Sequence, residues 1–394
     1  MAGPDPSPSP TVFLANSGLV AGAPIAGKII RGESGEEDTT QHRSSIPFAI
    51  SLNLLSDSWN FQPDRFLPFL TENTDFTVIG VIGGPGAGKS TIMNELYAFD
   101  SSSADMLPPF VIQSIEDRAM ARHCSNGIEP RISAERVILL DTQPVFSASV
   151  LVEMMEPDGS STISVMSGEG ESLSPQLAHE VMAIQLAVFL ASTCHILLVV
   201  SEGVHDDELW HLMSTADLLK NEISDPSLLS SSLSQSSSSE LEKDSKVSER
   251  EYMATPVFVH TKLRDQELTP KNILLLRKAL MQYFKTSSFV RKTTGNHSNE
   301  QVSSSMVHNG DMDSNVLNLF SIPFKGKEEN PRAQSYISAL RKIGDQILSV
   351  KRPSFMRPVS EREWLKSSAK IWEQVRNSSK ISEYCRSLQD SGMY

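Results

Sequence analysis

A glycine-rich segment that ends in a lysine and a serine is the part of the sequence best suited to bind a phosphate chain. The segment Gly83-Gly84-Pro85-Gly86-Ala87-Gly88-Lys89-Ser90 fits the pattern G-x-x-x-x-G-K-[ST]. Glycines let consecutive backbone N–H groups converge on a phosphate with no side chain in the way. The Lys89 ammonium group would bridge two phosphates, and the Ser90 hydroxyl would coordinate Mg²⁺. We therefore predict a site for ATP or GTP, or the diphosphate, with Mg²⁺, whose contacts come from Gly83, Gly86, Ala87, Gly88, Lys89, Ser90 and Thr91.

The segments on either side of this loop support the prediction. Residues 76–82 are a continuous apolar run, typical of a buried strand, and residues 90–99 have the composition of a helix. A helix that begins at the end of the loop points its positive end at a bound anion. Two alternatives remain at this point, a glycine-rich turn without a ligand and a folded loop that has lost its ligand.

Two further side chains could reach a metal ion. Asp141 ends an apolar run that predicts a strand, and in proteins with this loop such an aspartate orients Mg²⁺, usually through a water molecule. Ser125, in Ser-Asn-Gly-Ile, stands where large G proteins carry the switch-I threonine. A turn-forming aspartate and a plain Asn-Gly turn are the alternatives. We predict that Ser90, Asp141 and Ser125 form the metal site.

The residues that G proteins use for hydrolysis are replaced. G proteins read D-x-x-G here, but the glycine position is Pro144, which has no N–H to donate to a γ-phosphate. The next position, which carries the glutamine that orients water in Ras-type enzymes, is Val145. Gln143 lies two residues too early for that role. Whether the chain is an enzyme is uncertain, and we expect little or no hydrolysis.

The element that would read the base is also altered. Residues 257–265 resemble a strand followed by [NT]-K-x-D, so we predict base contacts from Thr261, Lys262 and Arg264. An arginine at the fourth position can only donate hydrogen bonds, whereas guanine recognition uses a carboxylate acceptor. Asp265 comes one residue late, as in a comparable Arg-Asp pair of guanylate-binding G proteins. Adenine and guanine therefore both remain possible, and an exposed charged turn is the alternative.

Composition limits the class of protein. The chain has 394 residues and a formal charge of −13, which argues against binding nucleic acid through its backbone phosphates. Its three cysteines fit a reducing compartment, and its start lacks the features of a signal peptide, so we expect a cytoplasmic protein with no specific nucleic-acid contact. Domain boundaries follow from Ser-rich and Pro-rich stretches. We expect a disordered tail (1–45), an α/β domain (46–350) with low-complexity inserts (224–250 and 286–314), and a C-terminal helical extension (351–394).

Apolar runs and helical periodicity alternate along the middle of the chain. They predict strands at residues 76–82, 136–140, 194–200, 257–261 and 316–322, and helices at 90–99, 176–190, 206–220, 270–284 and 332–350. We expect a flexible region at residues 100–131. This alternation predicts an α/β fold of the P-loop NTPase class, G-domain-like, with a mostly parallel sheet and helices on both faces. Residues 181–200 are long enough to cross a bilayer, but a buried helix followed by a buried strand fits their composition better.

Several of these segments together resemble the SMG-nine family, whose members are G-domain-like subunits of the nonsense-mediated mRNA decay machinery. The resemblance rests on the glycine-rich loop, on NGIEPRISAERVILLDTQP, CHILLVV and TKLR, and on WLKSSAKIWEQVRNSSKISEYCRSL near the C-terminus. It implies a heterodimer with SMG-eight through the two G-like domains, and assembly with SMG-one, a large protein kinase. The implied role is that of a nucleotide-binding scaffold and kinase regulator, with no membrane contact.

Other functions fit parts of the sequence. An active, membrane-associated GTPase of the guanylate-binding or atlastin type is suggested by the Ser-Asn-Gly-Ile and Arg-Asp elements. A small-molecule P-loop kinase is the weakest alternative, because no Arg-rich lid segment is present. Trp364 and Trp372 could anchor a partner or pack an amphipathic helix on its own domain.

Overall fold

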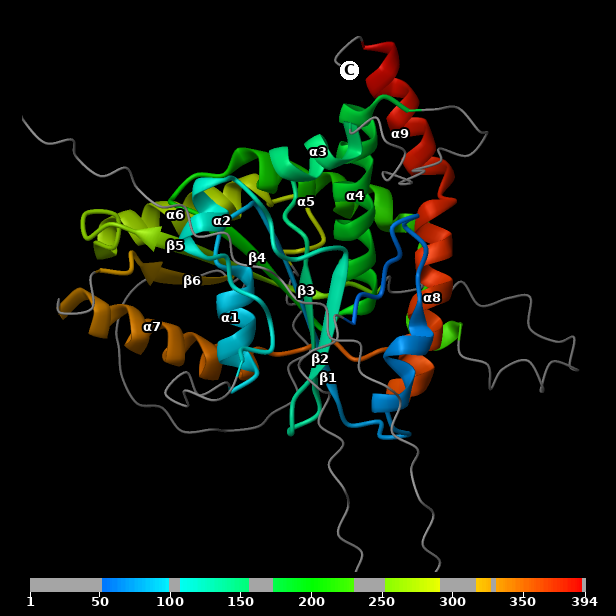
Figure 1. Ribbon diagram of the computed structural model, residues 1–394, viewed down its shortest axis with the longest axis horizontal. Helices are drawn as coiled ribbons and strands as arrows, with labels where there is room; N and C mark the ends of the chain where they lie inside the picture. Colours follow the sequence, from blue (N-terminus) through cyan, green and yellow to red (C-terminus); the bar gives the residue numbers. More distant parts are fainter. Residues whose placement is uncertain are drawn as a thin grey trace, which may run out of the picture. The chain divides into compact units, whose positions relative to one another are not determined.

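Six strands form one sheet in the order β2-β3-β1-β4-β5-β6 (Figure 1). Neighbouring strands run parallel except β2 and β3, which are antiparallel. The strands are β1 (Thr77–Gly83), β2 (Ile128–Ile132), β3 (Val137–Thr142), β4 (Ile196–Glu202), β5 (Thr255–Leu263) and β6 (Asn318–Pro323). The prediction of an α/β fold with a mostly parallel sheet is confirmed.

The computed structural model describes residues 52–98, 107–155, 173–229, 252–290, 317–326 and 331–391. Their helices are α1 (Lys89–Leu96), α2 (Ile115–Ala119), α3 (Ala148–Met155), α4 (Pro175–Thr193), α5 (Asp207–Leu219), α6 (Pro270–Tyr283), α7 (Pro331–Leu348), α8 (Glu361–Arg376) and α9 (Ser379–Asp390). All the described residues belong to one compact unit. The predicted tail and most of the two predicted inserts lie outside the described residues.

Both faces of the sheet are buried under helices, as the continuous apolar strands require. Side chains alternate along β1, so that Ile79 and Val81 belong to one hydrophobic cluster while Val78 and Ile82 belong to another. The first cluster includes residues of α1 and α7, and the second includes residues of α4, α5, α6 and α8. In Figure 1, α1 and α7 accordingly lie on the opposite side of the strands from α4 and α8.

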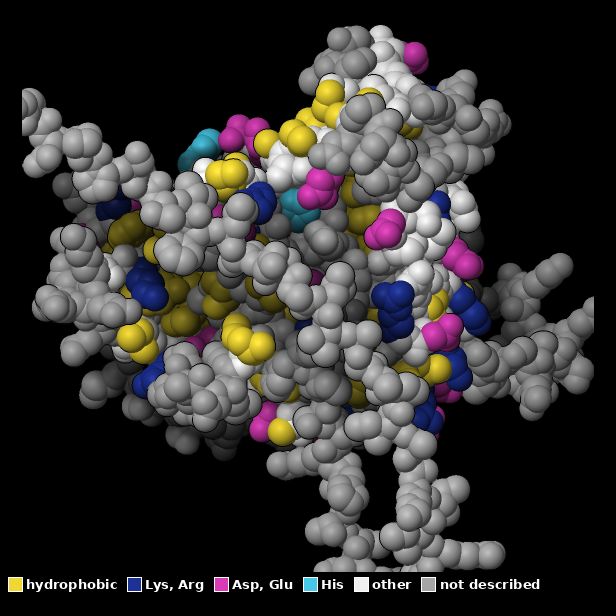
Figure 2. Space-filling view, in the orientation of Figure 1, with side chains coloured by type: hydrophobic (Ala, Val, Ile, Leu, Met, Phe, Trp, Pro, Cys, Tyr) yellow, Lys and Arg dark blue, Asp and Glu magenta, His cyan; other side chains and the backbone are white. Residues whose placement is uncertain are grey.

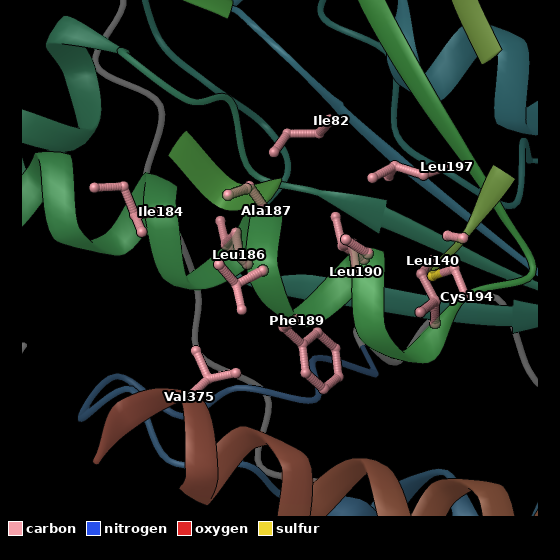
Figure 3. Packing of buried hydrophobic residues seen from close by; sticks show 14 of the residues in the cluster. Ile82, Leu140, Ile184, Leu186, Ala187, Phe189, Leu190, Cys194, Leu197 and Val375 are labelled. Atoms are coloured by element: carbon pink, nitrogen blue, oxygen red, sulfur yellow. The ribbon is translucent and has the colours of Figure 1, made fainter. Parts of the chain in front are cut away.

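Helix α4 is the centre of the larger cluster. Figure 3 shows its Leu190 on the side of Leu140 in the sheet, and its Phe189 on the side of Val375 in α8. The helix ends at Thr193, and β4 follows at Ile196, which confirms the predicted helix and strand within residues 181–200. Among the described helices, none combines the length and the apolarity that crossing a membrane would need.

The C-terminal tryptophans pack on their own domain. Trp364 and Trp372 are buried, and their indole N–H groups donate to Thr193 O at 2.9 Å and to Trp59 O at 3.0 Å. The rings of Trp59 and Trp372 meet edge to face, with centroids 5.6 Å apart. The alternative that they anchor a partner is therefore wrong, because their surfaces are already covered.

Some sequence-based expectations are corrected. The region predicted to be flexible (100–131) contains α2 and β2 where it is described, because β2 pairs along its whole length with β3. Residues 224–229 and 286–290, which we assigned to inserts, are ordered, since Asp225 and Phe289 are buried. The apolar side chains of α7 are only partly buried: Leu340, Ile343 and Ile347 are covered, while Ile337 and Leu348 are exposed.

A buried ion pair joins α8 to the start of the domain. The Glu361 carboxylate is fully buried and receives hydrogen bonds from Arg136 through both Nε, at 2.6 Å, and Nη2. The backbone N–H and the hydroxyl of Thr71 also donate to it, at 2.8 and 3.0 Å. All four donors converge on this one carboxylate, and Arg136 is its charged partner, so the pair fixes the first turn of α8 against the β2–β3 connection.

We predict that Glu361→Gln lowers the free energy of unfolding by about 2 kcal/mol, because it leaves the partly buried Arg136 guanidinium without its counter-charge. Urea unfolding followed by tryptophan fluorescence measures the change. The matched control is Glu135→Gln, which removes an exposed carboxylate next to Arg136 and should change stability by less than about 0.5 kcal/mol. Equal effects of the two substitutions would contradict the assignment.

Candidate functional site

The glycine-rich loop lies where the strand order reverses. From β1 the chain proceeds to β2 and β3 on one side, and then crosses to β4, β5 and β6 on the other. In open α/β sheets, ligands bind in the crevice at the carboxyl ends of the strands at such a reversal. The loop between Gly83 and Lys89 connects β1 to α1 at this position.

The loop glycines serve different purposes. Gly86 and Gly88 have φ angles of 69° and 97°, a backbone conformation that residues other than glycine rarely adopt. A Cβ at Gly84 or Gly88 would meet nothing within 4 Å, so open space borders the backbone where a ligand would lie. Gly83 is required for packing instead, because a Cβ there would lie 2.2 Å from the carbonyl oxygen of Val200.

Lys89 folds back over the loop. It is 6% exposed, and its ammonium group donates to the carbonyl oxygens of Gly83 and Gly84, at 3.0 Å each. Burial lowers the pKa of Lys89 to about 8, although the nearby Asp141 carboxylate opposes this shift. A cation held in such a costly position is well placed to meet the negative charge of a phosphate chain.

Asp141 is surrounded by hydroxyl groups at the end of β3. Its Oδ2 accepts hydrogen bonds from Ser90 Oγ at 2.7 Å and from Ser125 Oγ at 3.0 Å, and the two hydroxyl oxygens are 3.3 Å apart. Its other oxygen, Oδ1, is buried and has no hydrogen-bond partner among the described residues. Burial raises the pKa of Asp141, and the Lys89 charge and the two serine hydroxyls act in the opposite direction.

These residues fit Mg²⁺. The described residues contain no cluster of three or more His, Cys, Asp or Glu side chains that would form an all-protein metal site. Mg²⁺ does not need one, since it usually takes one or two protein oxygens and completes its shell with water and substrate phosphates. Ser90, Ser125 and the unpartnered oxygen of Asp141 are such oxygens, and the three predicted metal residues do meet in space. When bound, Mg²⁺ would neutralise charge on the phosphates.

The segment that carries Ser125 is fixed from two sides. Gln143 Oε1 accepts from the Gly127 N–H at 3.0 Å, and the Gln143 N–H donates to Gly127 O at 2.9 Å. On the other side, Asn53 Oδ1 accepts from the Ile128 N–H at 3.0 Å. Gly127 has a φ of 56°, and a Cβ there would lie 2.5 Å from Asn53. The residues that directly follow Ser125 are therefore held by protein contacts on both sides.

Positions 144 and 145 correspond to the glycine and the glutamine that G proteins use in hydrolysis, and neither presents such a group to the cleft. Val145 is 2% exposed and belongs to the larger hydrophobic cluster, and its N–H donates to Gly83 O at 3.2 Å. Pro144 lines the cleft beside the loop. The side chain at position 145 thus points into the core, where it cannot orient water.

The residues predicted to read the base are only partly at the cleft. Thr261 is buried, and its hydroxyl donates to Ala87 O at 2.8 Å, which ties β5 to the loop. Lys262 Nζ lies 2.5 Å from Glu202 Oε2 and 3.8 Å from a Cβ built on Gly86. Arg264 is exposed and is not among the residues that line the cleft. Thr261 and Lys262 therefore lie at the loop, although neither lines the cleft itself, and no contact joins the exposed Arg264 side chain to the loop among the described residues.

The sequence did not reveal one wall of the cleft. It is lined there by Val111, Ile112, Gln113, Arg118, His123 and Cys124, together with Thr91 and Ser125. The sequence predicts a flexible region at residues 100–131, and of this wall it indicates a role only for Thr91 and Ser125. Arg118 contributes a guanidinium group to this wall. His123 Nδ1 lies 2.8 Å from Ser149 Oγ, which connects the wall to α3.

Apolar side chains are exposed beside this wall. Figure 2 shows yellow side chains at the surface over α2 and α3. The exposed apolar residues of this region are Leu107, Val111, Ile112, Ile115, Met120, Val152 and Met155. Exposed apolar patches next to a binding cleft are typical of surfaces that contact other proteins.

Known proteins similar to this chain share a common name. Nonsense-mediated mRNA decay factor SMG9 of Xenopus tropicalis is 28% identical over 96% of this chain and 74% of its own length. The SMG9 proteins of Xenopus laevis and Salmo salar are each 29% identical, over 86% and 85% of this chain.

No protein-family model matches the chain. Among solved structures, a bacterial selenocysteine-specific elongation factor aligns with a TM-score of 0.28 and 9% identity over 70% of this chain and 29% of its own. Over most of its length, the chain is homologous to the vertebrate proteins named nonsense-mediated mRNA decay factor SMG9.

Proposed function

We propose that the chain binds a nucleoside di- or triphosphate with Mg²⁺ in this cleft, and that it acts through protein contacts rather than through turnover. The surroundings of Asp141 carry the proposal. A buried carboxylate with one unpartnered oxygen, two serine hydroxyls and a buried ammonium group are brought together at the end of a glycine loop. This combination supplies ligands of both signs, for a metal ion and for the phosphates that it bridges.

The homologues named SMG9 support a role in nonsense-mediated mRNA decay. We infer that the chain is a scaffold subunit of that pathway, which pairs with SMG-eight and regulates the SMG-one kinase in the cytoplasm. The exposed apolar residues over α2 and α3 supply a surface for such contacts. They lie next to the cleft, so a bound nucleotide could stabilise the same surface.

Slow or absent hydrolysis follows from the positions of two residues. Pro144 has no N–H, and Val145 is buried, so neither a γ-phosphate contact nor a water-orienting side chain is available there. Gln143 is held by Gly127 and cannot serve as a substitute. These observations count against an active GTPase of the guanylate-binding or atlastin type. Because no acceptor side chain occupies position 264, the proposal includes both ATP and GTP.

We expect Lys89→Ala to weaken Mg²⁺-nucleotide binding about 100-fold, because it removes the charged partner of the phosphates. Isothermal titration calorimetry with ATP and with GTP measures the effect, and Lys342→Ala, an exposed lysine of α7, is the matched control. Steady-state turnover should stay far below about 1 per second. A Lys89-dependent rate of that size or higher, or equal affinity of Lys89→Ala and the unsubstituted chain, would contradict the proposal.

Binding should also depend on pH in a defined direction. The pKa of Lys89 is about 8 in the free protein, and a polyphosphate stabilises its charged form. Above that pH the amine is neutral, so binding must take up a proton and the affinity should fall by up to about tenfold per pH unit. Titrations between about pH 7 and pH 9 check this, with Lys89→Arg, which stays charged, as the comparison. An affinity that rises over this range would refute the role of Lys89.

The two-sided support of Ser125 predicts a site that does not switch. Gln143→Ala removes the acceptor of the Gly127 N–H, so exchange of that amide should accelerate about tenfold. Hydrogen exchange read by mass spectrometry detects the change. Gln113→Ala, which removes a glutamine side chain that donates to the Arg122 carbonyl oxygen elsewhere in the cleft, should leave Gly127 unaffected. In the unsubstituted chain, protection that appears only after nucleotide is added would be the contrary result, because it would mean that the ligand orders this segment.

A further inference from the structure

A second cavity lies at the opposite edge of the sheet from the glycine loop. It has a volume of about 320 Å³ and is lined by residues just before β1, by His195 just before β4, and by the segment between α7 and α8. These are the amino ends of the parallel strands, whereas the glycine loop follows the carboxyl end of β1. Nothing in the proposed nucleotide site uses these residues.

One buried imidazole presents a hydrogen-bond donor to this cavity. His195 is 7% exposed, and its Nδ1 accepts the Val78 N–H at 3.0 Å. Burial lowers the pKa of His195 to about 4, so the ring is neutral near pH 7. Since Nδ1 is the acceptor, the single ring proton must be on Nε2. That N–H group has no hydrogen-bond partner among the described residues.

Two guanidinium groups border the same cavity. Arg352 lies 3.6 Å from Asp75 and donates to the Thr77 hydroxyl, and its side chain is 49% exposed. Arg357 is exposed and has no side-chain partner among the described residues, although its backbone N–H donates to Ser227. Asp75 is the one carboxylate among the described lining residues, so positive charge prevails.

Aromatic rings form the apolar part of the wall. The Phe355 ring packs on His195, with centroids 4.5 Å apart, and the Phe76 ring meets His195 edge to face at 5.8 Å. The cavity therefore combines three N–H donor groups, two of them charged, with apolar walls. A phosphate offers three oxygens to such donors, one more than a carboxylate. Apolar walls favour a phosphate that is attached to an organic group over a fully hydrated free ion.

We propose that this cavity binds a phosphate monoester, with its oxygens held by Arg352, Arg357 and His195 Nε2 and its organic group against Phe76 and Phe355. The ester can belong to a small molecule or to a phosphorylated side chain, because both present the same group. Binding in this cavity should not depend on a ligand in the glycine loop, since the two sites lie at opposite ends of the parallel strands.

The test is a titration of the full chain with phenyl phosphate, observed by ³¹P NMR and by long-range ¹H–¹⁵N NMR of the histidine side chains. We expect saturable binding and a shift of His195 Nε2. Inorganic phosphate should bind at least about fivefold more weakly, because it lacks the apolar contact. A phosphotyrosine peptide distinguishes the two sources: tighter binding than phenyl phosphate assigns the site to a protein segment, and equal or weaker binding assigns it to a small molecule.

Matched variants separate the site from general charge effects. Arg357→Gln should weaken phenyl phosphate binding about tenfold, whereas Lys342→Gln, the same charge change on exposed α7, should have no effect. His195→Asn keeps an acceptor for the Val78 N–H but lacks the Nε2 donor, and should also weaken binding. Melting temperatures confirm that each variant is folded. No binding up to about 10 mM, equal affinity for inorganic phosphate, or an unchanged affinity of Arg357→Gln would overturn the proposal.

Discussion

One buried carboxylate, that of Asp141, determines how the cleft is organised. Its two oxygens are used differently: one accepts from the hydroxyls of Ser90 and Ser125, and the other has no partner among the described residues. Burial moves the pKa of this acid up and that of Lys89 down, so each charge is less stable here than in water. A metal ion and a phosphate chain would relieve both penalties at once, and the free energy of binding would include that relief.

The surroundings of this carboxylate hold it still. Thr142, the next residue, donates from its hydroxyl to Val81 O at 2.7 Å, so β3 is fixed to β1 beside the loop. Thr261 fixes the loop to β5, and Gln143 with Asn53 fixes the segment that carries Ser125. In GTPases that switch, segments at this place become ordered only when the γ-phosphate and Mg²⁺ contact them. Under the function that we propose, these contacts favour a ligand that stays bound over one that switches the segment.

The sequence predicted those parts that depend on local pattern. The apolar runs of β1, β3, β4 and β5 are too continuous to be anything but buried strands, and the glycine spacing specifies the loop between β1 and α1. Contacts between distant segments could not be read in this way. Asn53 is an unremarkable asparagine until the fold places it against Gly127. In β2, Ile128 and Ile132 alternate with Glu129 and Arg131, but Pro130 between them cannot donate to a sheet and argues against a strand in the sequence. Trp364 and Trp372 were compatible with two roles, and only the position of α8 against α4 and Trp59 decides between them.

The most direct measurement is a crystal structure of the chain grown with Mg²⁺ and excess ATP or GTP. Our account predicts phosphate density inside the loop, a metal ion beside Ser90 and Asp141, and Lys89 Nζ moved from the carbonyl oxygens of Gly83 and Gly84 to the phosphates. An empty loop at saturating nucleotide, with Lys89 still bonded to those two carbonyls, would contradict it.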